Sequence, residues 1–524
     1  MPALTLLPRL GRRAFLLGSA VSAAMLAGTP RLRAQTPVRG GLLRISISQR
    51  VNTLNPLRHS NASDYMAGEM MYSGLTRLGW KMEALPDLAT RWDANQDLTV
   101  WTFQLRRGAM FRGVNREVTP RDAIASIKAM LDPATASPAR AALSPIKEAM
   151  EAGPAAVKVT LNYPFSDLPV ALAHNDARIV PAEILEKDIK LLETADYGTG
   201  PFKLKDYEPG RILRVERDPR YFQAGKPYVN AIEQRIYPDL AAELAALLNK
   251  ESDIMLGLAE TDFDQVSKNP AIQTYRVQSG RFFNLVLRTD QKPFDDVRVR
   301  RALQFSLDRQ ALVDLVLQGF GRVAADSPIS SEYPFYRAMP PVRQDITQAK
   351  KLLAEAGYPN GLRIVLYCAN RPAARSALGI AVKELAKPAG FDIDVQTIAY
   401  DAYNVTIWRK ANFYVANWNM QPTEDALFGL LFTTDAPWND TQWNNAAFDD
   451  LVRRARATRD PAARGKLYGD AQSLLNAECP YIIPFFQDIL SASQKWVVNY
   501  RIHPRGGQYF LEEVSLADGG AMRK

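Results

Sequence analysis

The three histidines are the first residues to consider for chemistry, because imidazole is a common general base and metal ligand in proteins. They are His59, His174 and His503, and they lie far apart in the chain. None pairs with another at the four-residue spacing of a helical zinc site, and none stands near a cysteine. Downstream of residue 34 there is also no GxSxG turn. The sequence therefore predicts no metal site and lacks the landmark of a serine hydrolase.

The two cysteines, Cys368 and Cys479, are the next reactive groups. An oxidising compartment permits a disulfide between them. Their separation in the sequence gives no information on their distance in space, so two buried free thiols are an equal alternative.

Aromatic side chains are concentrated between residues 400 and 443. Half of the chain's eight tryptophans fall in this interval. The group consists of Trp408, Trp418, Trp438 and Trp443, with Tyr400, Tyr403, Phe413 and Tyr414 among or beside them. Aromatic walls suit a cleft that holds a partly apolar ligand, and core packing is the alternative for each ring. The interval predicts ligand contacts, with Tyr414, Trp418 and Trp438 as candidates.

The elements that position these residues alternate between strands and helices. An apolar run over 282–287 predicts a strand, after which Pro293 breaks the pattern. Asp295 or Asp296 and then Asp308 can cap two short helices. The cleanest helix begins after Asp345 and ends before a glycine at 357, which can take the left-handed position beyond a helix end. The pattern indicates an α/β protein of two or three domains, because 524 residues exceed one simple domain.

The first 34 residues indicate an export signal. They contain five arginines and no acidic residue, and Gly11–Leu17 resembles the twin-arginine motif. An uncharged stretch of 14 residues follows, Ala14–Ala27, which is short of the about 20 needed to span a bilayer. Cleavage is expected near Ala34. No cysteine lies near that point, so we expect a soluble periplasmic protein without a covalent membrane anchor.

The charge of the remaining chain argues against a nucleic-acid partner. The formal net charge is +9, but residues 35–524 hold 60 basic and 56 acidic residues. No run of Lys and Arg that could follow a phosphate backbone occurs there.

Four segments resemble one protein family. They are KPFDDVRVRRALQFSLDRQALVD at Lys292–Asp314, the block from Leu85 to Ile124, YGTGPFKL at Tyr197–Leu204, and DITQAKKLLAEAGYPNG at Asp345–Gly361. Together they resemble the family 5 extracellular solute-binding proteins, receptors of ABC importers for peptides, opines and nickel complexes. The resemblance covers about residues 39–494.

This resemblance implies a two-lobed periplasmic binding protein of type II, similar to its large cluster C. Mixed sheets flanked by helices would enclose a ligand cleft between the lobes. After the signal at 1–34, lobe I would span 35–283, with a smaller subdomain around 76–190. Lobe II would span 284–486, and a tail at 487–524 would return to lobe I.

The implied function is capture of a small organic ligand for import, such as a peptide, a modified peptide or an opine-like compound. The partners would be an ABC permease and its separate ATPase, with the receptor a monomer that is no enzyme and has no cofactor. A nickel-complex or haem receptor of the same family remains an alternative. A secreted hydrolase is the alternative outside the family.

The resemblance also names ligand-facing residues. In the oligopeptide and dipeptide receptors, the segment matching 412–423 carries an aspartate that binds the ligand's free ammonium. That aspartate falls on Asn417 here, with Glu424 or Asp425 as shifted substitutes. The loop after the first strand, with Arg50 and Asn52, is the family's other ligand-facing segment. A neutral amide at 417 and a cation at 50 weaken the prediction of a free peptide, because only an anion can neutralise a buried ammonium.

Overall fold

The computed structural model describes residues 37–517, and the predicted export signal lies outside them. An eleven-stranded mixed sheet forms the framework. Its strands, in spatial order, are β15 (Phe391–Ile398), β14 (Leu362–Ala369), β16 (Phe413–Trp418), β12 (Ile272–Leu287), β17 (Tyr481–Gln494), β11 (Ile254–Met255), β1 (Leu42–Ile47), β10 (Ala231–Ile236), β9 (Ile212–Arg217) and β8 (Phe202–Glu208), with β13 (Gly321–Val323) beside β17.

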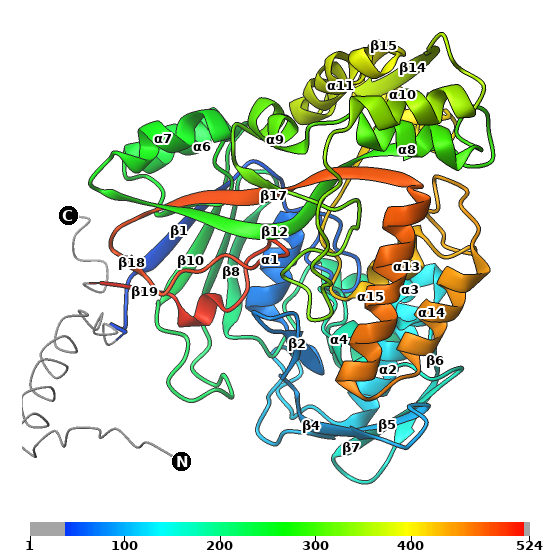
Figure 1. Cartoon of the computed structure of the whole chain (residues 1–524). Coiled ribbons are helices and arrows are strands. Elements are labelled where there is room, and N and C mark those ends of the chain that lie inside the picture. The colour runs from blue at the N-terminus through cyan, green and yellow to red at the C-terminus, as the bar shows by residue number, and fades with distance from the viewer. Residues whose placement is uncertain (1–36, 518–524) are drawn as a thin grey trace, which may run out of the picture. The chain divides into compact units, whose positions relative to one another are not determined.

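Two long antiparallel strands, β12 and β17, join the two halves of this sheet (Figure 1). The second half of β12 pairs with β16, whereas Ala492 and Ser493 of β17 pair with β11. The lobe boundaries predicted at 283 and 486 therefore fall inside continuous strands. An extended backbone can keep its ladder hydrogen bonds on both sides of such a boundary, so no Gly- or Ser-rich linker is required.

A separate four-stranded antiparallel sheet lies within residues 89–161. Its strands are β4 (Ala89–Ala94), β5 (Val100–Leu105), β7 (Ala156–Leu161) and β6 (Ile146–Glu151). Helix α2 (Pro120–Leu131) contacts β6 and β7. Thr119 and Asp122 form a capping box around Pro120, which satisfies backbone amides that the first helical turn leaves free.

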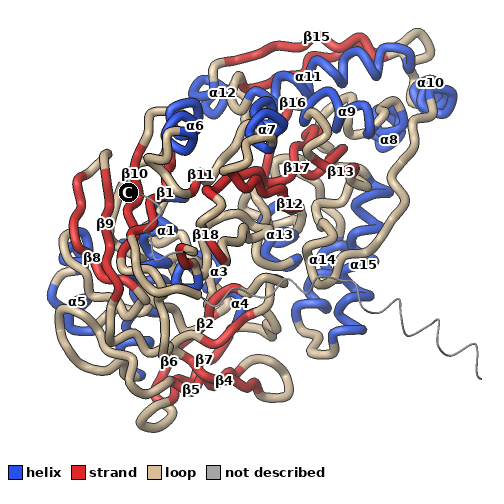
Figure 2. Tube along the Cα trace, turned by 90° about the vertical axis from the view of Figure 1, so that its left-hand side faces the viewer, coloured by secondary structure: helices blue, strands red, loops and turns tan. Residues whose placement is uncertain are grey.

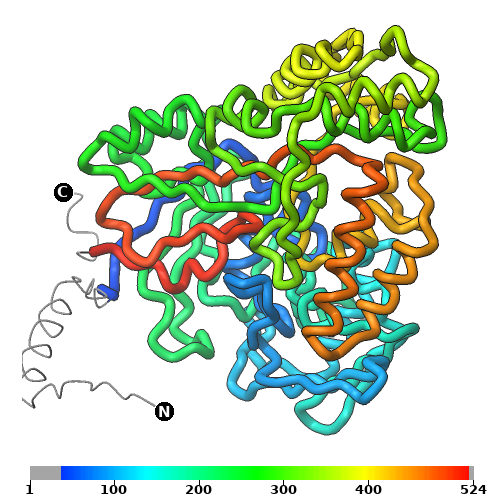
Figure 3. Tube along the Cα trace, viewed as in Figure 1, coloured from blue at the N-terminus to red at the C-terminus, as the bar shows by residue number. Residues whose placement is uncertain are grey.

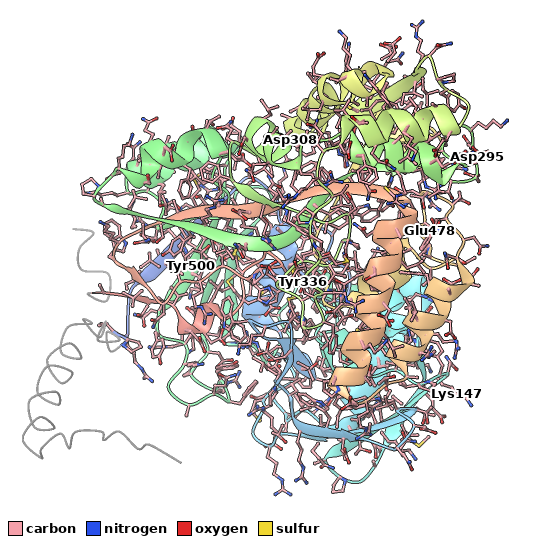
Figure 4. All side chains as sticks on the ribbon, viewed as in Figure 1. Lys147, Asp295, Asp308, Tyr336, Glu478 and Tyr500 are labelled. Carbon is pink, nitrogen blue, oxygen red and sulfur yellow. The ribbon has the colours of Figure 1, made fainter. Side chains whose placement is uncertain are left out.

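Helices α8 (Val297–Phe305), α9 (Arg309–Leu317), α10 (Ile346–Glu355) and α11 (Ala373–Ala386) share one apolar core with β14 and β16. The four helices and β14 are grouped at the top of Figure 1. The predicted caps are confirmed: Asp296, Asp308 and Asp345 each accept a backbone amide of the helix that follows. Figure 4 shows Asp308 at the start of α9 and Glu478 at the end of α15 (Pro461–Glu478). Cys368 and Cys479 both lie in this core as free thiols, so the disulfide is not formed.

A second core lies on the opposite face of β16. It contains residues of α12 (Tyr400–Thr406), α13 (Glu424–Leu431), α14 (Ala446–Arg456) and α15. Helices α14 and α15 are separate, because Asp460 caps a new helix with Pro461 in its first turn.

The C-terminal segment packs on the N-terminal half of the chain, as the red and blue tubes of Figure 3 show. Arg77 bonds to Glu512 at 2.7 Å, Lys226 bonds to Glu513 at 2.6 Å, and His503 Nε2 lies 2.9 Å from the Gly79 carbonyl oxygen. Figure 2 shows β18 and the sheet edge at β8 from the side.

The remaining elements are short. They are α1 (Ala62–Met71), β2 (Thr76–Leu78), β3 (Ala84–Pro86), α3 (Arg140–Leu143), α4 (Leu168–Ala171), α5 (Ala182–Lys187), α6 (Leu240–Leu248), α7 (Glu260–Ser267), β18 (Val497–Val498) and β19 (Ser515–Leu516). Within residues 37–517, every helix is too short or too polar to cross a bilayer.

Candidate ligand-binding site

The candidate site lies where the parallel strands β14, β15 and β16 end. β14 pairs in parallel with both β15 and β16. The chain leaves β14 into α11 and leaves β15 into α12, so the starts of both helices meet the carboxyl ends of the strands. In α/β sheets this edge is the usual location of ligands, because loops and helix N-termini converge there.

Three half-buried tryptophans form a cluster beside this edge. Trp408 and Trp438 stack with ring centroids 5.0 Å apart, and Trp418 lies 6.3 Å from Trp438 in an edge-to-face arrangement. Arg409 covers Trp438 at 5.4 Å. The fourth tryptophan of the interval, Trp443, is only 4% exposed and packs in the core. The structure therefore brings the predicted Trp418 and Trp438 together and adds Trp408.

One side chain on β12 and one on β16 have polar atoms that are buried without a partner in the described residues. The indole N–H of Trp418 and both amide atoms of Asn284 are buried without a hydrogen bond. Asn284 pairs with Ala416 in the ladder and Phe282 pairs with Trp418, so Asn284 and Trp418 face the same side. Buried polar atoms are normally satisfied, so unpaired ones are candidates for ligand contacts.

Asn417 stands at the end of β16 and is half-buried. Its Oδ1 accepts a hydrogen bond of 2.8 Å from Nε of Arg375, the third residue of α11. By the resemblance, this position would carry the aspartate that binds a ligand's ammonium in the peptide receptors. Here the side chain at this position instead binds Arg375, a cation of the protein itself. Arg375 also lies 5.7 Å from the Tyr400 ring centroid and 5.2 Å from that of Tyr403.

The structure gives Tyr414 a packing role. Its side chain is fully buried, and its hydroxyl accepts the backbone amide of Arg409 at 3.1 Å. Burial raises its pKa far above the usual value for tyrosine. Strand β16 is buried on both faces along Phe413–Ala416, so alternation could not show which side faces a ligand.

Arg50 and Asn52 lie on the exposed loop after β1. Asn52 donates its backbone amide to Asp64 at 2.6 Å and its side-chain amide to Ser60 at 3.1 Å, which fixes the loop on the start of α1. Within residues 37–517, neither side chain has a hydrogen bond or ion pair to β16, so the structure does not join them to the tryptophan cluster.

Glu424 and Asp425, the shifted alternatives to Asn417, belong to the first turn of α13 and are buried. Glu424 accepts the backbone amide of Phe335 at 2.6 Å, and Asp425 accepts Nε of Arg456 at 2.9 Å. Both carboxylates therefore accept hydrogen bonds from other groups of the protein.

We predict that Glu424→Gln stabilises the protein at alkaline pH. Burial raises the pKa of Glu424 to about 7 from 4.5. Because its native pKa is raised, the carboxyl contributes most to the free energy of unfolding at low pH. This contribution is lost as pH rises from about 4.5 through 7. Unfolding free energies of the variant and the wild type should differ little at pH 4.5 and diverge by about 3 kcal/mol at pH 8.

Urea titrations at several pH values measure this difference, with Glu384→Gln on the exposed face of α11 as the control. A difference that does not change with pH would contradict the prediction.

Two of the three histidines lie beside one buried carboxylate. His59 and His174 flank Asp176, at 3.5 and 3.4 Å. Burial lowers the pKa of both histidines to about 3 and raises that of Asp176 to about 7. In the described part of the chain, no group of His, Cys, Asp and Glu is arranged to hold a metal ion.

Comparison with known proteins agrees with the fold and with the motifs. Residues 83–440 match the family model of bacterial extracellular solute-binding proteins, family 5 middle region. The glutathione-binding protein GsiB of Escherichia coli K12 is 27% identical over 495 residues, which cover 90% of this chain and 94% of that protein.

Solved structures show the same fold. HbpA2 from Haemophilus parasuis has a TM-score of 0.82 at 24% identity, covering 91% of this chain and all of its own. The binding protein AgaA of A. tumefaciens R10, in complex with agropinic acid, has a TM-score of 0.75 at 25% identity, covering 91% of this chain and 99% of its own. Because the family model matches more than half of this chain, the chain belongs to the family 5 bacterial extracellular solute-binding proteins.

Proposed function

We propose that the chain is the periplasmic receptor of an ABC importer and captures a small organic ligand of the peptide or opine type. The observation that carries the proposal is the half-buried cluster of Trp408, Trp418 and Trp438 at the carboxyl ends of β14 and β16. Stacked rings bind apolar parts of a ligand, and the unpaired polar groups beside them can fix its orientation.

The names of related proteins support this ligand class. GsiB is a glutathione-binding protein, and AgaA is complexed with agropinic acid. Both ligands are small organic acids with polar and apolar parts. We propose that residues 35–283, with the tail at 487–524, and residues 284–486 act as two lobes joined by β12 and β17. Closure over a ligand would exclude water and strengthen each polar contact. A separate permease and ATPase would then carry out the import.

Native mass spectrometry of protein purified from a periplasm without denaturation tests the proposal. We expect a retained small molecule, which is released unchanged on unfolding. Thermal unfolding with glutathione, agropinic acid and dipeptides should then show one class that stabilises the protein by about 2.7 kcal/mol at 100 Kd. Chemical conversion of the ligand would instead favour a hydrolase, and retention of a metal chelate or haem would favour the alternative within the family.

A further inference from the structure

A buried ion pair joins lobe II to the subdomain of lobe I at 76–190. Arg464, near the start of α15, donates Nη2 to the carboxylate of Asp167, the residue before α4. The two residues are 297 positions apart in the chain, and Figure 1 shows α4 beside α15. The pair therefore connects the two proposed lobes at a place remote in sequence from the strands that join them.

Among the ion pairs of residues 37–517, only two cross from one proposed lobe to the other. Arg322 and Asp488, 3.9 Å apart, belong to β13 and β17, which are paired strands of the shared sheet. That pair is part of the connection between the lobes. Asp167 and Arg464 form the other pair and belong to no strand of that sheet. It is the one crossing ion pair of the described residues that lies outside the shared sheet.

Backbone contacts on both sides accompany this ion pair. Ser166 donates its backbone amide to the carbonyl oxygen of Arg456, the last residue of α14, at 3.0 Å. Arg459 donates Nη2 to the carbonyl oxygens of Ala94 and Asn95 at 2.9 and 2.6 Å. Ala94 ends β4, so this contact is made at the turn toward β5. Two separate segments of the subdomain thus meet the same short stretch of lobe II.

The charge of Arg464 is neutralised from the other lobe. The side chains of Asp167 and Arg464 are 8% and 10% exposed. Within residues 37–517, Asp167 is the only carboxylate within 4 Å of the Arg464 guanidinium. On its own lobe, Arg464 has the hydroxyl of Tyr468 at 3.4 Å and the ring of Phe335 at 5.0 Å. These neutral groups stabilise a cation only in part, so the closed contact depends on the carboxylate.

An ion pair at this interface differs from an apolar contact in what happens on separation. When the two side chains part, the carboxylate and the guanidinium both return to water, and their hydration offsets most of the lost attraction. Separation of an apolar contact instead exposes hydrophobic surface, which is unfavourable over its whole area. A buried ion pair can therefore specify which residues meet in the closed form without making the open form costly.

We propose that Asp167 and Arg464 form a latch that holds the subdomain against lobe II in the closed form and separates when the lobes open. This inference rests on the proposed function, because a latch requires two lobes that move. It gives the four-stranded sheet a role, since β7 leads to Asp167 and β4 ends at the turn that Arg459 contacts. The strength of the latch sets the ratio of closed to open molecules.

Two kinds of substitution should move this ratio in opposite directions. Asp167→Asn leaves Arg464 unpaired in the closed form, whereas water solvates the guanidinium in the open form. The closed form should therefore lose at least about 100-fold in its equilibrium with the open form. The double variant Asp167→Leu/Arg464→Met removes both charges and leaves an apolar contact, which should favour the closed form.

Small-angle X-ray scattering of the ligand-free proteins measures the ratio. We expect a larger radius of gyration for Asp167→Asn than for the double variant, with the wild type between them or equal to one of them. Lys466→Gln is the matched control, because Lys466 is exposed on α15 and pairs with Asp470 of the same helix. It should scatter like the wild type. Hydrogen–deuterium exchange of peptides that contain Ser166 should be faster in Asp167→Asn and no faster in the double variant.

Equal radii of gyration in the single and the double variant would overturn the proposal. A change in thermal stability without a change in scattering would also overturn it, because a static packing contact gives that result. If Asp167→Asn does not fold, Arg464→Gln takes its place in the same comparison, since it leaves Asp167 unpaired in the closed form. These outcomes are separate from the proposed function, which fails only if no small organic ligand is retained.

Discussion

Replacement of Arg309 by Met is expected to reduce the free energy of unfolding by about 3 to 5 kcal/mol, a large part of what a domain possesses. Arg309 is the first residue of α9 and donates Nη2 to Asp326. Both side chains are almost completely buried. Without the guanidinium, the carboxylate of Asp326 would remain in the core without a counter-charge.

The network around Asp326 explains the size of this effect. Asp326 also accepts Nε2 of Gln304 at 2.9 Å and the backbone amide of Ile483 at 2.9 Å. It therefore connects the end of α8 and the start of α9 to β17. Such a network is rigid when every member is satisfied, and the loss of one member leaves the others desolvated.

Chemical denaturation measures this prediction, with Arg301→Met on the exposed face of α8 as the matched control. Burial already raises the pKa of Asp326, and loss of Arg309 should raise it further. The deficit of the variant should therefore be smaller at pH 5 than at pH 8, because protonation removes the unpaired charge. The double variant Arg309→Met/Asp326→Leu should regain much of the lost stability. A deficit below about 1 kcal/mol at pH 8 would show that the pair is not needed.

Local signals in the sequence were sufficient to predict where helices begin and end. Asp308 and Asp345 cap helices as predicted, and Gly357 adopts a φ of 95°, which places it in the left-handed region beyond α10. These features depend on residues within one or two turns of each other, so a sequence pattern contains the information. The α/β class follows from the same alternation.

The pairing of Arg375 with Asn417 was not predictable from such signals. The two residues are 42 positions apart, and they meet only because β14, α11, β15 and β16 bring the strand ends to one edge. A signal was nevertheless present: Arg375 follows the apolar strand β14 and a proline. Residues directly after a parallel strand are candidates for the ligand edge. The lobe boundaries predicted at 283 and 486 fall inside the continuous strands β12 and β17.

Replacement of Trp418 by Ala is expected to weaken binding of the retained ligand by about 2 to 4 kcal/mol, a loss of at least about 30-fold in affinity. Trp418 contributes a ring to the cluster and an indole N–H without a partner in the described residues. Truncation to Ala removes both. Trp418→Phe keeps an aromatic ring and should lose only about 1 kcal/mol, the net value of one hydrogen bond.

The graded series distinguishes a ligand contact from a packing residue. Isothermal titration gives the affinity of each variant, and thermal unfolding without ligand gives its stability. Trp92→Phe, in the four-stranded sheet, is the matched control because it removes an indole far from β16. If Trp418→Phe binds as weakly as Trp418→Ala, the N–H bond dominates. If both variants bind normally, the ligand contacts lie elsewhere, because truncation of a central aromatic anchor typically costs about 2 kcal/mol or more.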